Sequence, residues 1–133
     1  MPGGGPHNVG PGQVTDDSEM AMCMLWGLTF NQEKQEGGVI LNAESIATFY
    51  KEWIKSKPFD IGNTTANALE NLNDECPNLT RTAKFCSFMQ NKESCSNGCL
   101  MRQTPMAVWA SGLEPLDLRN ATNCDVTFTH ASS

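Results

Sequence analysis

Two adjacent carboxylates and a hydroxyl group are the first residues in this sequence that could do chemistry. Thr15, Asp16 and Asp17 follow a glycine- and proline-rich segment and come directly before an apolar run. Their oxygen atoms are the hard ligands that Mg²⁺ and Mn²⁺ prefer. Acidic residues at the start of a helix also cap its free N–H groups and interact favourably with its dipole. The pattern therefore predicts either a divalent-cation site or an ordinary helix start.

A short polar loop is the second candidate. Residues 94–98 read Ser-Cys-Ser-Asn-Gly and lead into an apolar segment that contains Arg102. A loop of small residues exposes backbone N–H groups that can bind an anion such as phosphate, although ordinary turns have the same composition. Arg102 could bind the same anion or pair with one of the carboxylates. An anion site and a plain turn are both compatible with these residues.

A single histidine near the end of the sequence is the third candidate. His130 could contact a substrate, but an isolated histidine is more often a packed or surface residue than a catalytic one. The sequence contains no P-loop, no dinucleotide-binding glycine fingerprint and no Ser/His/Asp arrangement. The commonest signatures of nucleotide-binding proteins and of serine-nucleophile enzymes are therefore missing.

Helical segments are predicted to hold these candidates in place. Asp16 and Glu19 have the spacing of a capping box, and Asn42 is a plausible cap for a second helix. Thr64 or Thr65 could cap a third helix. Apolar residues recur at helical spacing along the chain. The predicted helices cover residues 16–28, 42–55, 64–72, 80–90 and 100–110.

The segments between these helices give weaker signals. Residues 1–14 hold five glycines and three prolines and are predicted to form a loop or an extended arm. Residues 31–41 are predicted to be a polar surface connection. Pro105 must lie in the first turn of its helix or kink it. Residues 125–130 alternate like a β-strand, but no second strand is available to pair with them, so a helix is predicted there.

Apolar positions on the predicted helices indicate the core of an all-α fold. The Met-rich run 20–24 and the three tryptophans are expected inside. The other residues expected to face inward are Ile46, Phe49, Tyr50, Ile54, Ala68, Leu69, Leu72, Ala83, Phe85, Cys86, Phe88 and Met89.

Composition narrows the class of protein. The chain has 133 residues, with 9 Lys and Arg against 15 Asp and Glu, and a net charge of −6. This acidic balance argues against nucleic-acid binding, which rests on clustered cationic side chains. The length allows one domain, and no apolar run approaches the ~20 residues needed to cross a bilayer. Six cysteines without zinc-ligand spacing or a secretion signal predict reduced thiols in a cytoplasmic protein, with the nucleus or the mitochondrion as alternatives.

Four motifs, taken in order, resemble the ADP-ribosylglycohydrolase family, which includes the dinitrogenase reductase-activating glycohydrolases. Gly3-Gly-Gly-Pro6 and Pro11-Gly-Gln-Val-Thr-Asp-Asp-Ser-Glu-Met-Ala21 are similar to the first motif. Asp60-Ile-Gly-Asn-Thr-Thr65 resembles the second motif, Ser96-Asn-Gly-Cys-Leu-Met-Arg102 the third and Thr129-His-Ala-Ser-Ser133 the fourth. The resemblance covers nearly the whole chain and implies an orthogonal helical domain.

The resemblance also implies a function. It implies a hydrolase that removes ADP-ribose from modified protein side chains, or from ADP-ribose conjugates, at a two-Mg²⁺ site where Mn²⁺ is an alternative ion. By position, Thr15, Asp16 and Asp17 are the implied metal ligands, and Asp16 and Asp17 are the implied catalytic residues. The implied partners are an ADP-ribosylated protein or ADP-ribose, with no nucleic acid and no membrane. The implied substrate-binding residues are Gly62, Ser96, Asn97, Gly98 and His130.

The family pattern contains two elements that these 133 residues lack. A catalytic glutamate precedes the first motif, and a D-x-D-[ST] motif near the C-terminal end supplies further metal ligands. The resemblance therefore implies that residues 1–133 are part of a larger helical domain and hold half of the metal ligands. The alternative is an inactive relative that binds ADP-ribose or serves as a structural piece, with a partner chain covering its exposed helix faces.

Overall fold

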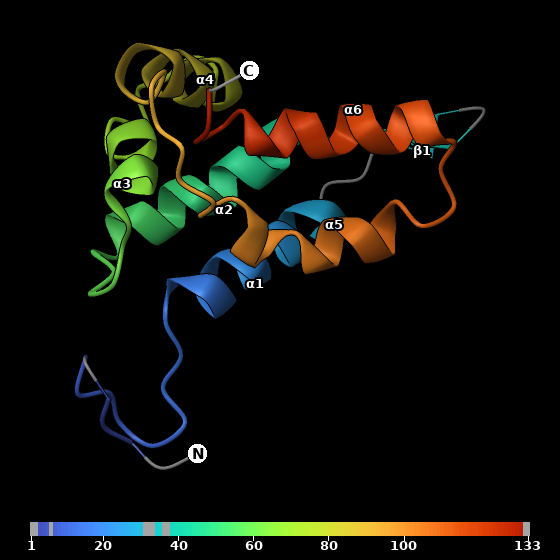
Figure 1. The fold of residues 1–133 in the computed structure, drawn as a ribbon. Coiled ribbons are helices and arrows are strands. Elements are labelled where there is room, and N and C mark those ends of the chain that lie inside the picture. Colours follow the sequence, from blue (N-terminus) through green and yellow to red (C-terminus); the bar gives the residue numbers. More distant parts are fainter. Residues whose placement is uncertain (1–2, 6, 31–33, 36–37, 132–133) are drawn as a thin grey trace.

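The structure, a computed structural model, describes residues 3–5, 7–30, 34–35 and 38–131. Within these ranges the fold is helical, as predicted (Figure 1), and no helix is long and apolar enough to cross a membrane. Two short antiparallel strands, β1 (Lys34–Gln35) and β2 (Gly38–Val39), pair inside the predicted surface connection. The helices are α1 (Asp16–Phe30), α2 (Ala43–Lys55), α3 (Asn63–Leu69), α4 (Leu79–Gln90), the 3₁₀ helix η1 (Leu100–Arg102), α5 (Thr104–Trp109) and α6 (Pro115–Val126).

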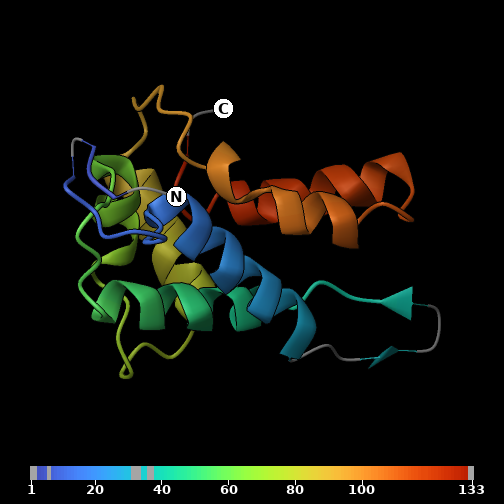
Figure 2. The same cartoon turned by 90° about the horizontal axis from the view of Figure 1, so that it is seen from below.

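Helix α1 is at the centre of the packing. It lies against α2, and also against η1 and α5, while α2 contacts α3 and α4. Figures 1 and 2 show α3 and α4 at one end of α2, and the glycine-rich N-terminal segment running from the start of α1 toward the side of α3. The arrangement brings the first residues of α1 to the same end of the molecule as the turn before α3.

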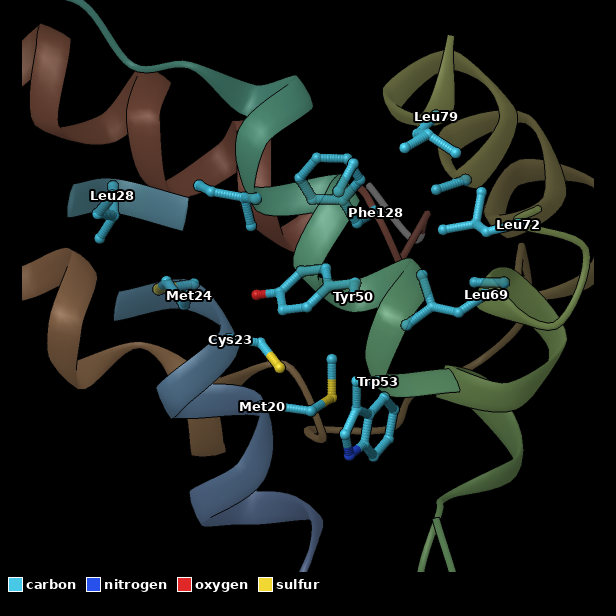
Figure 3. Close-up of a cluster of buried hydrophobic side chains, with 14 of the residues drawn as sticks. Met20, Cys23, Met24, Leu28, Tyr50, Trp53, Leu69, Leu72, Leu79 and Phe128 are labelled. Atoms are coloured by element: carbon cyan, nitrogen blue, oxygen red, sulfur yellow. The ribbon is translucent and has the colours of Figure 1, made fainter. Parts of the chain in front are cut away.

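The core lies where α1 and α2 cross (Figure 3). Trp53 is buried as predicted, and Trp109 packs partly against the core, but Trp26 is 41% exposed, so its predicted burial is wrong. Met20 and Met24 of the Met-rich run are buried, whereas Met22 is exposed, because a helix buries one stripe of its surface. The other buried members of the cluster include Cys23, Leu28, Ile46, Tyr50, Ala68, Leu69, Leu72, Leu79, Ala83 and Phe128.

Helix α4 has apolar residues on two faces, and one of these faces is buried. Ala83 and Cys86 lie on the buried face. Phe85, Phe88 and Met89 are expected inside from the sequence, but they are 63%, 57% and 62% exposed. That prediction is wrong because α4 meets its neighbours α2 and α3 along one stripe only. The exposed face is a candidate for contact with another protein surface.

Gly27 allows α1 and α2 to approach closely. A Cβ atom at this position would lie 2.6 Å from the Cα of Ile46 and 2.9 Å from its backbone nitrogen. We expect Gly27→Ala to lower the free energy of unfolding by roughly 1–3 kcal/mol, because the two helices must move apart. Urea denaturation measures this change. Gly112→Ala is the control, since a Cβ there meets no atom within 4 Å; equal losses in both variants would contradict the prediction.

The start of α2 matches the prediction, and the start of α1 does not. Asn42 caps α2, with its side-chain oxygen accepting the N–H of Ser45 at 3.0 Å. The capping box predicted for α1 is wrong, because the carbonyl of Thr15 accepts the first helical hydrogen bonds. The carboxylate of Glu19 instead accepts a hydrogen bond from Trp53 Nε1 at 2.7 Å. This glutamate therefore joins α1 to α2.

Neither threonine predicted to cap α3 does so. The helix begins at Asn63 after Gly62, and no side chain caps it. Thr65 is buried, and the hydroxyl of Thr64 shares a hydrogen bond with Ser94 Oγ at 3.0 Å. Thr64 therefore joins the start of α3 to the polar loop.

The helix predicted over residues 125–130 is largely wrong. Helix α6 carries Pro115 in its first turn and ends at Val126, and residues 127–130 form turns whose amides bond back to carbonyls of the helix end. Phe128, within the alternating pattern, is buried. Its ring meets the ring of Tyr50 edge-on, with 5.8 Å between the ring centroids. Pro105 lies in the first turn of α5, in line with one of the two predicted alternatives.

A glutamate of α2 caps the N-terminal end of α4. The Glu44 carboxylate accepts the N–H of Leu79 at 2.6 Å and of Thr80 at 3.0 Å. Burial disfavours the charge of Glu44, but the hydrogen bonds from Thr80 and Leu79 outweigh it and hold its pKa below 4.5. A lowered pKa in the folded state stabilises the fold above the unfolded pKa, and this stability is lost as the pH falls through the folded pKa.

We expect Glu44→Gln to lower the free energy of unfolding at neutral pH by about 1 kcal/mol. The variant should also lose less stability than the unsubstituted protein as the pH falls from about 5 to about 3. The amide oxygen still accepts one hydrogen bond, but it carries no charge that can be titrated. Urea denaturation at several pH values measures both effects. Glu70→Gln, at an exposed position at the end of α3, is the control. An unchanged pH dependence in Glu44→Gln would contradict the prediction.

Candidate functional site

The carboxylates of the first candidate cluster lie at the start of α1. The carbonyl of Thr15 accepts the N–H groups of Ser18 and Glu19, both at 3.1 Å. Asp16 Oδ1 accepts the N–H of Asp17 at 3.0 Å, and Thr15 Oγ1 donates to Asp17 Oδ2 at 3.5 Å. The structure thus brings the three predicted metal ligands together at one helix terminus.

A third carboxylate, Asp60, approaches this cluster from the turn before α3. Burial raises the pKa of Asp16, and the negative charges of Asp60 and Asp17 raise it further. His7 Nε2 of the glycine-rich segment lies 3.6 Å from Asp60 Oδ2. Asp60 was absent from the predicted site residues, although it opens the second motif. Its effect on Asp16 acts between residues 44 positions apart, which no local pattern reveals.

These oxygens fit part of a divalent-cation site. Besides burial, the negative charges of Asp60 and Asp17 raise the pKa of Asp16, and a cation would relieve this repulsion. Carboxylate and hydroxyl oxygens are suitable ligands for Mg²⁺ or Mn²⁺. Among the described residues, however, no three His, Cys, Asp or Glu side chains are close enough together to hold an ion. The predicted metal site stays a prediction that needs further ligands.

The polar loop 94–98 is held in place by its own serines. The N–H of Ser96 donates to Ser94 Oγ at 3.3 Å, and the N–H of Gly98 donates to Ser96 Oγ at 3.2 Å. Thr64 holds Ser94 from the start of α3. Two of the amides proposed to face an anion, those of Ser96 and Gly98, are therefore hydrogen-bonded inside the loop.

Gly62 and Asn97 make mainly backbone contacts in the described part of the chain. Gly62 is exposed, and its carbonyl accepts the N–H of Ala66 at 2.9 Å. Asn97 is also exposed, and its carbonyl accepts the N–H of Leu100 at 2.9 Å. A Cβ added to Gly62 would meet no atom within 4 Å, so there is open space beside it. Both residues are accessible to a ligand.

His130 joins the C-terminal segment to the polar loop. The side chain is 4% exposed, with Nδ1 2.8 Å from Thr129 Oγ1 and Nε2 3.3 Å from Ser96 Oγ. Burial and the positive charge of Arg102 lower the pKa of His130, so the ring is neutral at pH 7. The structure thus brings His130, Ser96 and Gly98 together, three of the five predicted substrate-binding residues.

Arg102 pairs with a carboxylate, which decides between its two predicted roles. Its Nε donates to Asp125 Oδ2 at 2.9 Å, and its Nη2 donates to Thr129 Oγ1 at 2.9 Å. Both charged side chains are fully buried. Asp125 also accepts hydrogen bonds from the hydroxyl of Tyr50 at 2.8 Å and from Gln103 Nε2 at 2.6 Å. Arg102 therefore stabilises the fold beneath the loop and does not reach a ligand in solvent.

Asn91 is a further residue that the sequence did not single out. It is 2% exposed, and its Nδ2 donates to the carbonyls of Thr64 at 2.7 Å and Thr129 at 2.9 Å. Its Oδ1 accepts a hydrogen bond from Asn67 at 3.2 Å. Asn91 thereby fixes the start of α3 against the segment that carries His130. A polar residue at the end of a helix gives no signal of such a buried role.

The four motif segments lie one after another in space. They are separated in the chain by tens of residues, yet each motif, or a residue beside it, lies near the next. Proximity of this kind is expected if the motifs serve one site. The first link is Asp60, whose charge raises the pKa of Asp16 and whose Oδ2 lies 3.6 Å from His7 Nε2. The other two links are the hydrogen bonds of Thr64 with Ser94, just before the third motif, and of Ser96 with His130.

An apolar groove of about 400 Å³ lies between α1 and α2. The rings of Trp26 and Phe49 lie along it, with their centroids 5.9 Å apart. None of the predicted site residues lines the groove. The groove therefore adjoins the start of α1, where Val14 and Ser18 line it, without including the three predicted metal ligands.

Comparison with known proteins identifies the family. A family model described as ADP-ribosylglycohydrolase matches residues 1–133. The chain belongs to the ADP-ribosylglycohydrolase family. This membership confirms the resemblance that the four motifs indicate.

Named relatives of this glycohydrolase-family chain are considerably longer. It is 37% identical over 100 residues to an Acanthamoeba polyphaga mimivirus protein named as an ADP-ribosyl glycohydrolase, covering 75% of the chain and 26% of the relative. It is 30% identical over 130 residues to the ADP-ribosyl-[dinitrogen reductase] glycohydrolase of Rhodospirillum rubrum, covering 98% of the chain and 39% of the relative. It is 31% identical over 112 residues to an ADP-ribosylarginine hydrolase of Serratia proteamaculans, covering 82% of the chain and 28% of the relative. No solved structure matches the chain.

Proposed function

We propose that this chain is part of a hydrolase that removes ADP-ribose from modified protein side chains or from ADP-ribose conjugates. The observation that carries the proposal is that the four family motifs lie near one another in series, from the start of α1 to His130. Family membership over residues 1–133 supports it, as do relatives whose names describe ADP-ribosyl hydrolases. The chain spans 26–39% of the length of the relatives described above, so the further parts of the site belong to the proposal.

Each residue has a role that follows from its position. Thr15, Asp16 and Asp17 would hold Mg²⁺ or Mn²⁺, which when bound polarises the anomeric centre and lowers the pKa of a coordinated water. Gly62 leaves open space for the ligand beside α3. The residues proposed to orient the anionic diphosphate are Ser96, Asn97, Gly98 and His130. These groups hold a diphosphate with hydrogen bonds, so an acidic protein can bind an anionic ligand.

A second candidate is an inactive relative that binds ADP-ribose or serves as a structural piece. The exposed face of α4 supports it, because Phe85, Phe88 and Met89 together would suit burial against a partner chain. The incomplete ligand set for a cation supports it as well. For both candidates we propose a cytoplasmic location, in keeping with six free cysteines.

Release of ADP-ribose from an ADP-ribosylated arginine or serine peptide distinguishes the two candidates. If the chain is a working part of the hydrolase, release should require Mg²⁺ or Mn²⁺ and should stop when EDTA is added. The test is made with the 133-residue chain and with the same chain extended by the remaining segments of the Rhodospirillum rubrum relative. Release by either protein supports the hydrolase. ADP-ribose binding with no release by both proteins supports the inactive relative.

A further inference from the structure

A hydrogen-bond chain runs from the buried Arg102 to the surface loop. Arg102 Nη2 donates to Thr129 Oγ1 at 2.9 Å, and the same oxygen lies 2.8 Å from His130 Nδ1. On the other side of the ring, His130 Nε2 lies 3.3 Å from Ser96 Oγ. Arg102, Thr129 and His130 are buried and Ser96 is exposed, so this hydrogen-bond chain connects the core to solvent.

The donor and acceptor groups determine which atom donates in each hydrogen bond of this series. Arg102 can only donate, so it occupies one lone pair of Thr129 Oγ1. If His130 Nδ1 also donated to Thr129, the buried hydroxyl hydrogen of Thr129 would have no acceptor among the described residues. An unpaired buried donor is unfavourable, so the hydroxyl of Thr129 donates to Nδ1. The neutral ring of His130 therefore carries its proton on Nε2.

The position of this proton determines what Ser96 can do. His130 Nε2–H donates to Ser96 Oγ, and the N–H of Gly98 donates to the same oxygen at 3.2 Å. Both lone pairs of the hydroxyl are then occupied. The hydroxyl hydrogen of Ser96 is left to donate to a group outside the loop.

We propose that Arg102 is a positioning residue that acts through Thr129 and His130 to present the Ser96 hydroxyl as a hydrogen-bond donor to the diphosphate of ADP-ribose. The identity of the ligand rests on the proposed function. A diphosphate only accepts hydrogen bonds at neutral pH, so a hydroxyl fixed as a donor suits it better than one that rotates freely. The buried ion pair with Asp125 keeps the guanidinium in place.

Nitrogen-15 NMR of the imidazole ring tests the position of the proton without any ligand. The chain has two histidines, and His7→Gln leaves the ring of His130 as the single signal to observe. We expect this ring to carry its proton on Nε2 at neutral pH. Thr129→Val removes the hydroxyl at similar volume and should give a mixture of the two tautomers, whereas Thr129→Ser should keep the Nε2–H form. A proton on Nδ1 before substitution, or an unchanged ring in Thr129→Val, overturns the proposal.

Binding of ADP-ribose tests the consequence for Ser96. We expect Thr129→Val and Ser96→Ala each to weaken binding by about tenfold, and the double variant to bind no more weakly than Ser96→Ala alone. Calorimetric titration measures the affinities, with Thr129→Ser as the rescuing control and thermal denaturation as the check on folding. Additive losses overturn the proposal. If neither the 133-residue chain nor the chain extended by the remaining segments of its relative binds ADP-ribose, the proposed function and the ligand assigned here are both wrong, whereas the tautomer result stands independently.

Discussion

Asp125→Ala is expected to lower the free energy of unfolding by about 3–5 kcal/mol. The carboxylate is fully buried and compensates the equally buried charge of Arg102. It also accepts hydrogen bonds from Tyr50 and Gln103. Alanine would leave the Arg102 cation and the Tyr50 hydroxyl buried without this acceptor, whereas Gln103 keeps its hydrogen bond to the carbonyl of Cys99. The unpaired cation dominates the loss, because a charge removed from water has no other means of compensation.

Urea denaturation followed by circular dichroism measures this effect, and Asp117→Ala is a matched control. Asp117 lies on the same helix, α6, but is exposed in its first turn, so its loss should cost less than about 1 kcal/mol. Replacing both partners, with Arg102→Met and Asp125→Leu, should be less destabilising than Asp125→Ala alone because no unpaired charge is left. A double variant as unstable as the single one would show that packing matters more than charge.

Helices with a local signal could be predicted from the sequence. The predicted ranges 16–28, 42–55 and 80–90 differ from α1, α2 and α4 by two residues or fewer at each end. Apolar periodicity and capping residues such as Asn42 depend only on neighbouring positions, so the sequence alone reveals them. Helix α6 could not be found in this way, because its residues are mostly polar and few of them are buried.

Contacts between distant residues could not be predicted. The sequence leaves open whether Arg102 meets an anion or a carboxylate, and its partner Asp125 lies 23 positions away. The electrostatic effect of Asp60 on Asp16 and the buried role of Asn91 likewise depend on how the helices pack. The order of the motifs predicts which residues share a site, and the fold shows which of these residues lie near one another.

Asp16→Asn is expected to make the metal-free chain more stable near neutral pH. Burial and the charges of Asp60 and Asp17 raise the pKa of Asp16 above 3.8, so its charge is unfavourable in the folded state. A raised folded pKa means that this charge costs stability above that pKa and costs nothing once the pH is below the unfolded value. Asparagine has a similar shape without the charge. The thermal midpoint should therefore rise at pH 7 and remain unchanged below about pH 3.8.

A divalent cation should reverse the sign of this effect, because a metal site needs the same charge that destabilises the free protein. At a Mn²⁺ concentration 100-fold above Kd, binding adds about 2.7 kcal/mol to the free energy of unfolding, and Asp16→Asn should lose this gain. Scanning calorimetry with and without Mn²⁺ measures both effects, and Asp117→Asn, in the first turn of α6, should keep the gain. A gain that persists in Asp16→Asn would place the ion elsewhere. In a functional carboxylate cluster, removing one charge stabilises the fold and abolishes binding of the cation. A lower thermal midpoint of metal-free Asp16→Asn would therefore show that Asp16 mainly stabilises the start of its helix.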